Sequence, residues 1–505
     1  MRRFFLAIAC FLLHFFSALS NNLVLRNGAI EGNAISFEIG WDNSWNLTSQ
    51  QGNHDAVWVF LKGRNPSGVW VHIDISTLAT SHSAVSPLAV QPVTDGKGVF
   101  IYPQEQGVFS HSPSLIILAA ESSLTSFSEI RVYGIEMVQI PEGDFFIGDG
   151  VSVSSLSNTI GEPVKISSEN ALNPLNLIVN NPNSQFTPHE LASSLPAEFP
   201  KGFASFYAMK YEVTQLQYAD FLNTLTYNQQ KSRTASAPNS SKGTYVMINP
   251  YQPDSLYRNG IVIMEPGVAT GKSAVYGVNA SKDNEYNGAN DGQHRAANFL
   301  SWADLSAYLD WAALRPMTEL EFEKVCRGPI APVAGELAWG TSLVTNANSP
   351  VDDGTIFETV SDVPASGSGL ANHGTFIATE GWGLRGVLRT GFAATSSSSR
   401  VEAGATYYGV MEMSGNVWEQ TVMVGGGGEV FTGNPGDGEL DENGNANQPS
   451  WCNPSTASGV LLKGGGWGST ISEVGSWRDL AVSDRFYSHL KPSTRRNSVG
   501  GRGAR

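Results

Sequence analysis

Between residues 21 and 133, apolar and polar side chains alternate with a period of two. Successive side chains of a β-strand point to opposite faces, so this alternation is typical of strands with one buried face. Gly, Asn, Ser or Pro separates each run from the next, which predicts an antiparallel β-sandwich over residues 21–135. The runs are "AISFEIGW", "DAVWVFLKG", "GVWVHIDI", "GVFIYPQ", "SLIILAA" and "SEIRVYGI".

Two tryptophans near the first run, Trp41 and Trp45 in "WDNSWN", have two interpretations. Exposed indoles could stack on sugars, whereas indoles inside or at the edge of a sandwich would only fill space. The second interpretation is the more common one for tryptophan.

Three later segments carry helix-start signals. In each, a Ser or Thr precedes a Gln, Asp or Glu by three positions, as in a capping box, and apolar residues follow at helical spacing. Short helices between long loops and short strands indicate an irregular α+β domain over residues 136–505. No Pro/Ser-rich linker precedes it, so we expect a tight junction near residue 135. The boxes are Thr214 with Gln217, Ser301 with Asp304, and Thr318 with Glu321.

A glycine-rich loop over residues 425–450 collects acidic and amide side chains, including Asp437, Glu439 and Asp441. These oxygens suggest calcium, but the loop lacks the ligand spacing and distal Glu of an EF-hand. A solvated acidic loop is the favoured interpretation.

The first twenty residues have the form of an export signal. Arg2 and Arg3 precede an apolar run, and small residues close the segment at positions 18–20. His14 interrupts the run, which is short for a membrane anchor. We therefore expect a signal peptide at 1–20 and a mature protein that is secreted, periplasmic or on the cell surface, without a transmembrane segment.

Charge and cysteine content exclude some functions. The formal net charge of −15 would repel a nucleic-acid backbone, so nucleic acid is not an expected partner. Beyond the signal only Cys326 and Cys452 remain, too few for a disulfide framework or a zinc site. Whether those two form a disulfide stays open.

Common catalytic signatures are missing. The chain has no HExxH and no GxSxG, and "GVATGKS" at residues 267–273 fails the spacing of a phosphate loop by one residue. Zinc hydrolysis, serine hydrolysis and nucleotide binding therefore have no support in the sequence.

Six separated blocks do carry specific information, and in this order they resemble the formylglycine-generating enzyme (sulfatase-modifying factor) family over residues 136–505. The resemblance implies a C-type-lectin-like fold and does not extend to residues 21–135. The blocks are "MVQIPEGDFFIGDG", "FYAMKYEVTQLQYADFLN", "AANFLSWADLSAYLDWAALRPMTELEFEKVCRG", "YYGVMEMSGNVWEQ", "LLKGGGWGS" and "RRNSVGGRGAR".

The resemblance also implies a structural calcium ion at the turn "SGNVWE". Carried over position by position, its ligands are the carbonyls of Ser414, Gly415 and Val417 and the carboxylate of Glu419. Oxygen donors of this kind suit calcium better than zinc or copper. The alternative is a hydrogen-bonded turn whose Trp418 fills the core. A second calcium site would fall near Asn346 and Asn348.

The family's oxidases hold copper(I) with two cysteines just beyond the block that matches "GGGW", and copper(I) needs such soft ligands. Residues 464–490 contain no cysteine, and neither Cys326 nor Cys452 matches the missing pair. A catalytic site is therefore not predicted, and copper is not an expected cofactor. A related branch uses a three-histidine iron motif, which this chain also lacks.

Other relatives on this scaffold are non-catalytic envelope components or receptors that bind ligands beyond the same block. By that analogy the ligand surface would contain small polar and aromatic side chains, a composition that binding loops use. Arg478, Arg485 and Arg496 are expected to pin the fold instead. The expected surface residues are Ser469, Ser472, Glu473, Ser476, Trp477, Asp479, Ser483, Tyr487 and His489.

The sequence thus favours an exported, non-catalytic binding or structural protein, a cell-envelope or extracellular-assembly component with a protein or glycan partner. One alternative is a copper-dependent formylglycine-generating oxidase acting on sulfatase cysteines. Another is a ligand- or carbohydrate-binding, lectin-like receptor.

Overall fold

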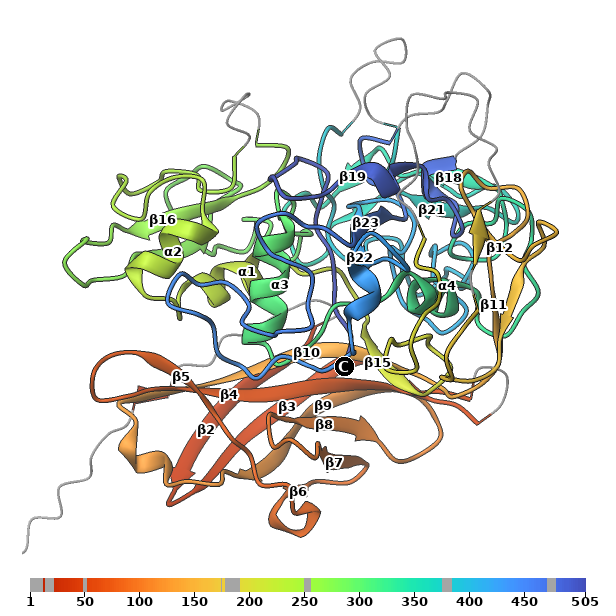
Figure 1. Ribbon diagram of the computed structural model, residues 1–505. Helices are drawn as coiled ribbons and strands as arrows, with labels where there is room; N and C mark the ends of the chain where they lie inside the picture. Colours follow the sequence, from red (N-terminus) through yellow and green to blue (C-terminus); the bar gives the residue numbers. More distant parts are fainter. Residues whose placement is uncertain are drawn as a thin grey trace, which may run out of the picture.

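The computed structural model describes residues 12–13, 22–48, 52–173, 175–177, 191–248, 256–374, 384–469 and 478–505. Strands β1 to β10 precede residue 141, and the four α-helices of the described residues follow it (Figure 1). The early strands are β1 (Leu12–Leu13), β2 (Val24–Glu31), β3 (Ala34–Asn46), β4 (Asp55–Arg64), β5 (Trp70–Ile73), β6 (Ser83–Ala84), β7 (Leu88–Pro92), β8 (Val99–Pro103), β9 (Gly107–Ala119) and β10 (Glu129–Ile140).

The later part combines the helices with short strands, mostly in two-stranded pairs, which makes the chain α+β as expected. The helices are α1 (Gln215–Leu222), α2 (Tyr227–Arg233), α3 (Trp302–Trp311) and α4 (Glu319–Arg327). The strands are β11 (Phe145–Ile147), β12 (Leu156–Ser157), β13 (Val164–Ile166), β14 (Asn176–Leu177), β15 (Phe206–Met209), β16 (Ile261–Glu265), β17 (Val275–Val278), β18 (Val344–Asn346), β19 (Pro350–Val351), β20 (Thr359–Val360), β21 (Gly369–Ala371), β22 (Glu419–Val422) and β23 (Val460–Lys463).

The early strands form two sheets. One has the order β2-β3-β9-β6, and the other runs β1-β10-β4-β8-β7, with β5 beside β4 and β15 beside β10. Side chains of both sheets meet in one hydrophobic cluster, in which Phe37 of β3, Val59 of β4 and Ile116 of β9 are all buried. Trp41 belongs to this cluster, so the space-filling interpretation of that indole is confirmed.

Strand β4 is buried on both faces, although an alternating run predicts only one buried face. Val57 and Val59 point into the cluster between the sheets, whereas Trp58 and Phe60 point into the core of the helical part. Trp58 Nε1 donates a hydrogen bond to the carbonyl of Ala312, just after α3, at 2.9 Å. The sheet that contains β4 therefore lies between the other sheet and the helices (Figure 1).

The chain enters the helical part without a linker, because β10 continues unbroken to Ile140. Its residues from Glu129 to Val138 pair with β4, and its last four residues pair with β15, from Met137↔Met209 to Ile140↔Phe206. A shared strand is a stiff connection, so the tight junction expected near residue 135 is present.

The three predicted capping boxes are all formed. Thr214, Ser301 and Thr318 each accept a hydrogen bond from the backbone three residues ahead, at the starts of α1, α3 and α4. Helix α2 was not predicted, although Thr226 and Gln229 form a fourth box before it. In the described part of the chain, no helix is long and apolar enough to cross a lipid bilayer.

The acidic loop is partly buried, so its interpretation as a solvated loop was wrong. The backbone N–H of Asp437 and that of Asn447 both donate to the Asp310 carboxylate of α3, at 3.0 and 2.9 Å. From the sheet, Lys62 donates to the carbonyl of Gly438, while Glu439 accepts from the N–H of His72. The loop therefore fastens the early sheet to α3.

Candidate functional site

The turn from Ser414 to Glu419 is fully enclosed. Ser414 is 3% exposed and Asn416 is 0% exposed. Gly415 has a φ of +98°, and an added Cβ would meet the carbonyl oxygen of Asn372 at 3.0 Å, so glycine suits both the conformation and the space. The sequence "SGN" thus fixes a tight turn just before strand β22.

The carboxylate of Glu212 fixes this turn by two hydrogen bonds. It accepts from Asn416 Nδ2 at 2.5 Å and from the N–H of Val417 at 3.0 Å. Burial raises the pKa of Glu212 well above its ordinary value, and neighbouring Glu412 adds to this while Arg502 opposes it. Glu212 was not predicted, although it lies in the quoted block "FYAMKYEVTQLQYADFLN".

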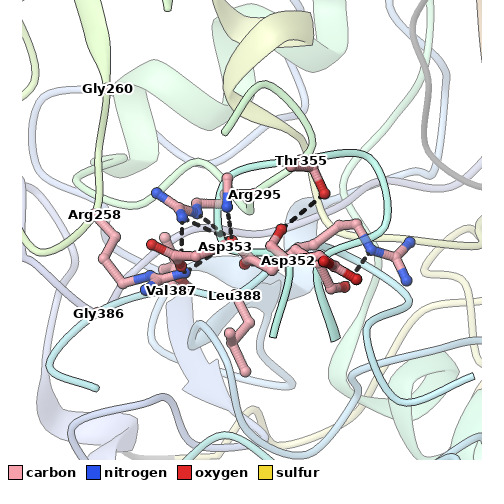
Figure 2. A network of polar contacts seen from close by, with 12 residues as sticks. Arg258, Gly260, Arg295, Asp352, Asp353, Thr355, Gly386, Val387 and Leu388 are labelled. Atoms are coloured by element: carbon pink, nitrogen blue, oxygen red, sulfur yellow. Dashed lines mark hydrogen bonds and ion pairs between the residues drawn. The ribbon is translucent and has the colours of Figure 1, made fainter. Parts of the chain in front are cut away.

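An arginine-rich network supports the other side of the same turn. Arg258 and Arg295 converge on Asp353 and on buried Glu358, and Figure 2 shows the two guanidinium groups facing Asp353. Arg258 Nε also donates to the carbonyl of Val387 at 2.8 Å. The next residue, Leu388, donates its N–H to Asn416 Oδ1 at 2.9 Å, so the network reaches the turn directly.

The four expected calcium ligands lie together, and their donors can be compared with what calcium needs. Among the described residues, none donates a hydrogen bond to the carbonyls of Ser414, Gly415 or Val417. The Glu419 carboxylate, however, already accepts from Arg502 Nε at 2.7 Å. Burial raises the pKa of Glu419, and Arg502 opposes that rise. Carbonyl and carboxylate oxygens are the donor types that suit a hard cation, and one of these four donors is shared with Arg502.

The second suggested calcium region also has oxygen donors. Asn346 Oδ1 is buried and accepts no hydrogen bond from any described residue. The N–H of Asn348 donates to Asp362 at 2.8 Å, which brings a carboxylate to this loop that sequence reasoning did not identify. In the part of the chain that the structure describes, no cluster of three or more His, Cys, Asp or Glu side chains could hold a metal.

Beyond the "GGGW" block lies a cavity of about 190 Å³. Trp418 and Tyr487 meet at its wall edge to face, with ring centroids 5.0 Å apart. Of the expected surface residues, Ser469, Asp479 and Tyr487 line this cavity, and Arg496 lines it too. Ser472, Glu473 and Trp477 lie outside the described residues, as does the side chain of His489.

Two further expectations for this segment can be compared with the structure. Arg485 is fully buried and pairs with Glu319 of α4 at 2.6 Å, so its role in pinning the fold is confirmed. Arg496 instead is an exposed side chain of the cavity wall.

Neither cysteine reaches the cavity. Cys326 and Cys452 are both free and buried, and they belong to separate hydrophobic clusters, so no disulfide joins them. Burial raises the pKa of the Cys452 thiol to about 12 and raises that of Cys326 as well. Such thiols stay protonated at neutral pH and are poor metal ligands.

A comparison with protein families matches residues 134–505 to a model described as "Sulfatase-modifying factor enzyme 1-like domain". The match covers more than half of the chain, begins within β10 and carries with it a C-type-lectin-like fold. No curated protein matches the chain significantly.

Proposed function

The chain belongs to the sulfatase-modifying factor enzyme 1-like family, and from that premise we propose that it is an exported, non-catalytic binding or structural protein. The observation that carries the proposal is the cavity beyond "GGGW". Its lining residues offer an indole, a phenol, a carboxylate and a guanidinium, but no thiol. Since residues 464–490 contain no cysteine, the soft ligands that a copper(I) oxidase needs are missing from that segment.

Residues 21–135 act as a β-sandwich domain that holds the family domain by one face. The cluster shared by two sheets and the double burial of β4 support this assignment. With the export signal at residues 1–20, the mature chain, residues 21–505, is secreted, periplasmic or on the cell surface. A role in the cell envelope or in an extracellular assembly fits such a scaffold.

Calcium has a structural role in this proposal. The carbonyls of Ser414, Gly415 and Val417 and the carboxylate of Glu419 hold the ion, which would neutralise part of the buried negative charge there. The chain's own groups do the rest: Glu212 fixes the turn by two hydrogen bonds, and Arg502 orients Glu419.

The proposed ligand surface includes Asp479 and Tyr487, which line the cavity, and, by the family analogy alone, Ser472, Glu473, Trp477 and His489. A cavity of about 190 Å³ is smaller than a typical drug-sized pocket, which fits one side chain or one sugar ring of a larger partner. The edge-to-face pair of Trp418 and Tyr487 would give such a ligand group an apolar surface to pack against.

Panning a displayed library of random peptides and probing a glycan array test this proposal. Selected peptides or glycans should bind the wild-type protein and lose affinity for Tyr487→Ala. The matched control is Tyr286→Ala, a half-buried tyrosine on a loop outside the cavity. Equal binding by both variants would mean that the ligand binds outside the cavity. Conversion of a cysteine-containing sulfatase peptide to formylglycine would mean that the protein is an enzyme.

A further inference from the structure

A second cavity of about 870 Å³ opens beside the first one. It lies between the end of α2, the start of α3 and the segment at residues 493–498, and Arg496 and Ser498 line both cavities. The two cavities are therefore adjacent and share a wall at Arg496 and Ser498. Their combined size is suited to an extended ligand rather than to a single small molecule.

The wall of the larger cavity is positively charged in a protein whose formal net charge is −15. Arg233 and Arg495 line it, and both pair with the buried carboxylate of Asp304, at 3.4 and 2.8 Å. Arg495 makes two hydrogen bonds to that carboxylate, each 2.8 Å long. One carboxylate therefore orients two guanidinium groups and leaves a net positive charge.

The arginines of this wall differ in their access to solvent. Arg233 is 4% exposed and its Nε is buried, without a hydrogen-bond partner among the described residues, so it contributes charge from inside the wall. Arg496 makes no ion pair with any residue the structure describes, and its exposed side chain lines both cavities. An anion at that position would meet Arg496 with Arg495 and Arg233 behind it.

The remaining wall is made of hydroxyl and amide groups. Ser232, Thr494 and Ser498 donate no side-chain hydrogen bond to a described residue, so they can pair with the polar groups of a ligand. No aromatic ring lines the larger cavity among the described residues, which leaves no platform for stacking a sugar. A peptide backbone, which needs donors and acceptors along its length, fits this wall better.

We propose that the two cavities form one cleft for an extended acidic peptide, with a carboxylate on Arg496 and a neighbouring apolar side chain against the contacting rings of Trp418 and Tyr487. The inference rests on the proposed binding function and adds the chemical class of the partner. The rest of this acidic protein would repel such a peptide, so electrostatics would favour the cleft over other surfaces.

Fluorescence anisotropy of the full chain with labelled octapeptides tests the proposal. The probe alternates Glu and Leu, and the comparison peptides replace every Glu by Lys or by Gln. We expect only the Glu peptide to bind, with an affinity that falls as salt is added. Arg496→Gln should weaken it about fivefold, the upper range for one exposed ion pair. Arg496→Lys should keep most of it.

Arg26→Gln is the matched control, because Arg26 is an exposed arginine of β2, outside the cleft, and this change should leave the affinity unaltered. Equal binding of the Lys peptide, or an unchanged affinity in Arg496→Gln, would overturn the proposal. So would a heparin fragment that displaces the Glu peptide and binds more tightly. If Tyr487→Ala abolishes binding and Arg496→Gln does not weaken it, the proposed binding function stands and the acidic class of the partner is wrong. If neither variant changes the affinity, the proposed function and the acidic class are both wrong.

Discussion

Replacing Trp58 tests whether the early sheets and the family domain fold as one unit. Trp58 is 0% exposed, donates to the carbonyl of Ala312 at 2.9 Å and lies under the guanidinium of Arg505 at 4.5 Å. Truncating a buried tryptophan costs about 3–5 kcal/mol in free energy of unfolding. Trp58→Ala should therefore cost about 4 kcal/mol, whereas Trp58→Phe should lose the hydrogen bond and part of the packing, about 1–2 kcal/mol.

Urea unfolding followed by tryptophan fluorescence and by circular dichroism measures both effects. Because β4 packs on both sides and β10 crosses the junction, the two signals should show one shared transition that Trp58→Ala shifts as a whole. Val108→Ala is the control, since Val108 is 74% exposed and should change little. Two separate transitions, with only one shifted, would refute the coupling.

Two further predictions concern charge and metal. Burial alone would raise the pKa of Glu358, but Arg295 and Arg258 lower it to about 2. A carboxyl whose folded pKa lies below its unfolded value stabilises the fold above the unfolded pKa, near 4.3, and loses that contribution as the pH falls toward 2. This pKa difference corresponds to roughly 3 kcal/mol in free energy of unfolding. In urea titrations, the free energy of unfolding should therefore fall less steeply between pH 5 and about 3 in Glu358→Gln than in the wild type. An equally steep fall in both proteins would rule this out. EDTA should lower the melting temperature and calcium should restore it, since an ion bound only by the native state stabilises it by about 3 kcal/mol at a hundredfold excess over Kd. Glu419→Gln should have a lower melting temperature that neither EDTA nor calcium changes. A wild-type melting temperature that EDTA does not change would exclude the site.

Local rules predicted the parts of this fold that depend on local sequence. Each Ser or Thr at a capping box needs only its own next three residues, and all three predicted boxes are present. Helix α2 has the same box, but its sequence "YNQQKSR" has no apolar face, so the periodic signal was absent.

Long-range packing explains what the sequence did not reveal. The run at β4 cannot show which later segments cover the face that carries Trp58 and Phe60, and the acidic loop cannot show that Asp310 and Lys62 will bind its backbone. Glu212 is more than 200 positions from the turn that it holds, so only the folded chain reveals the contact. The positive cleft likewise combines α2, α3 and the C-terminal segment.

A copper(I) titration of the purified protein, in competition with a chromogenic chelator, tests the central claim most directly. No stoichiometric copper(I) binding is expected, because Cys326 and Cys452 are buried in separate clusters and protonated. Tight binding of one copper(I) per chain, lost in Cys326→Ser or Cys452→Ser while the fold persists, would contradict this expectation and restore the oxidase.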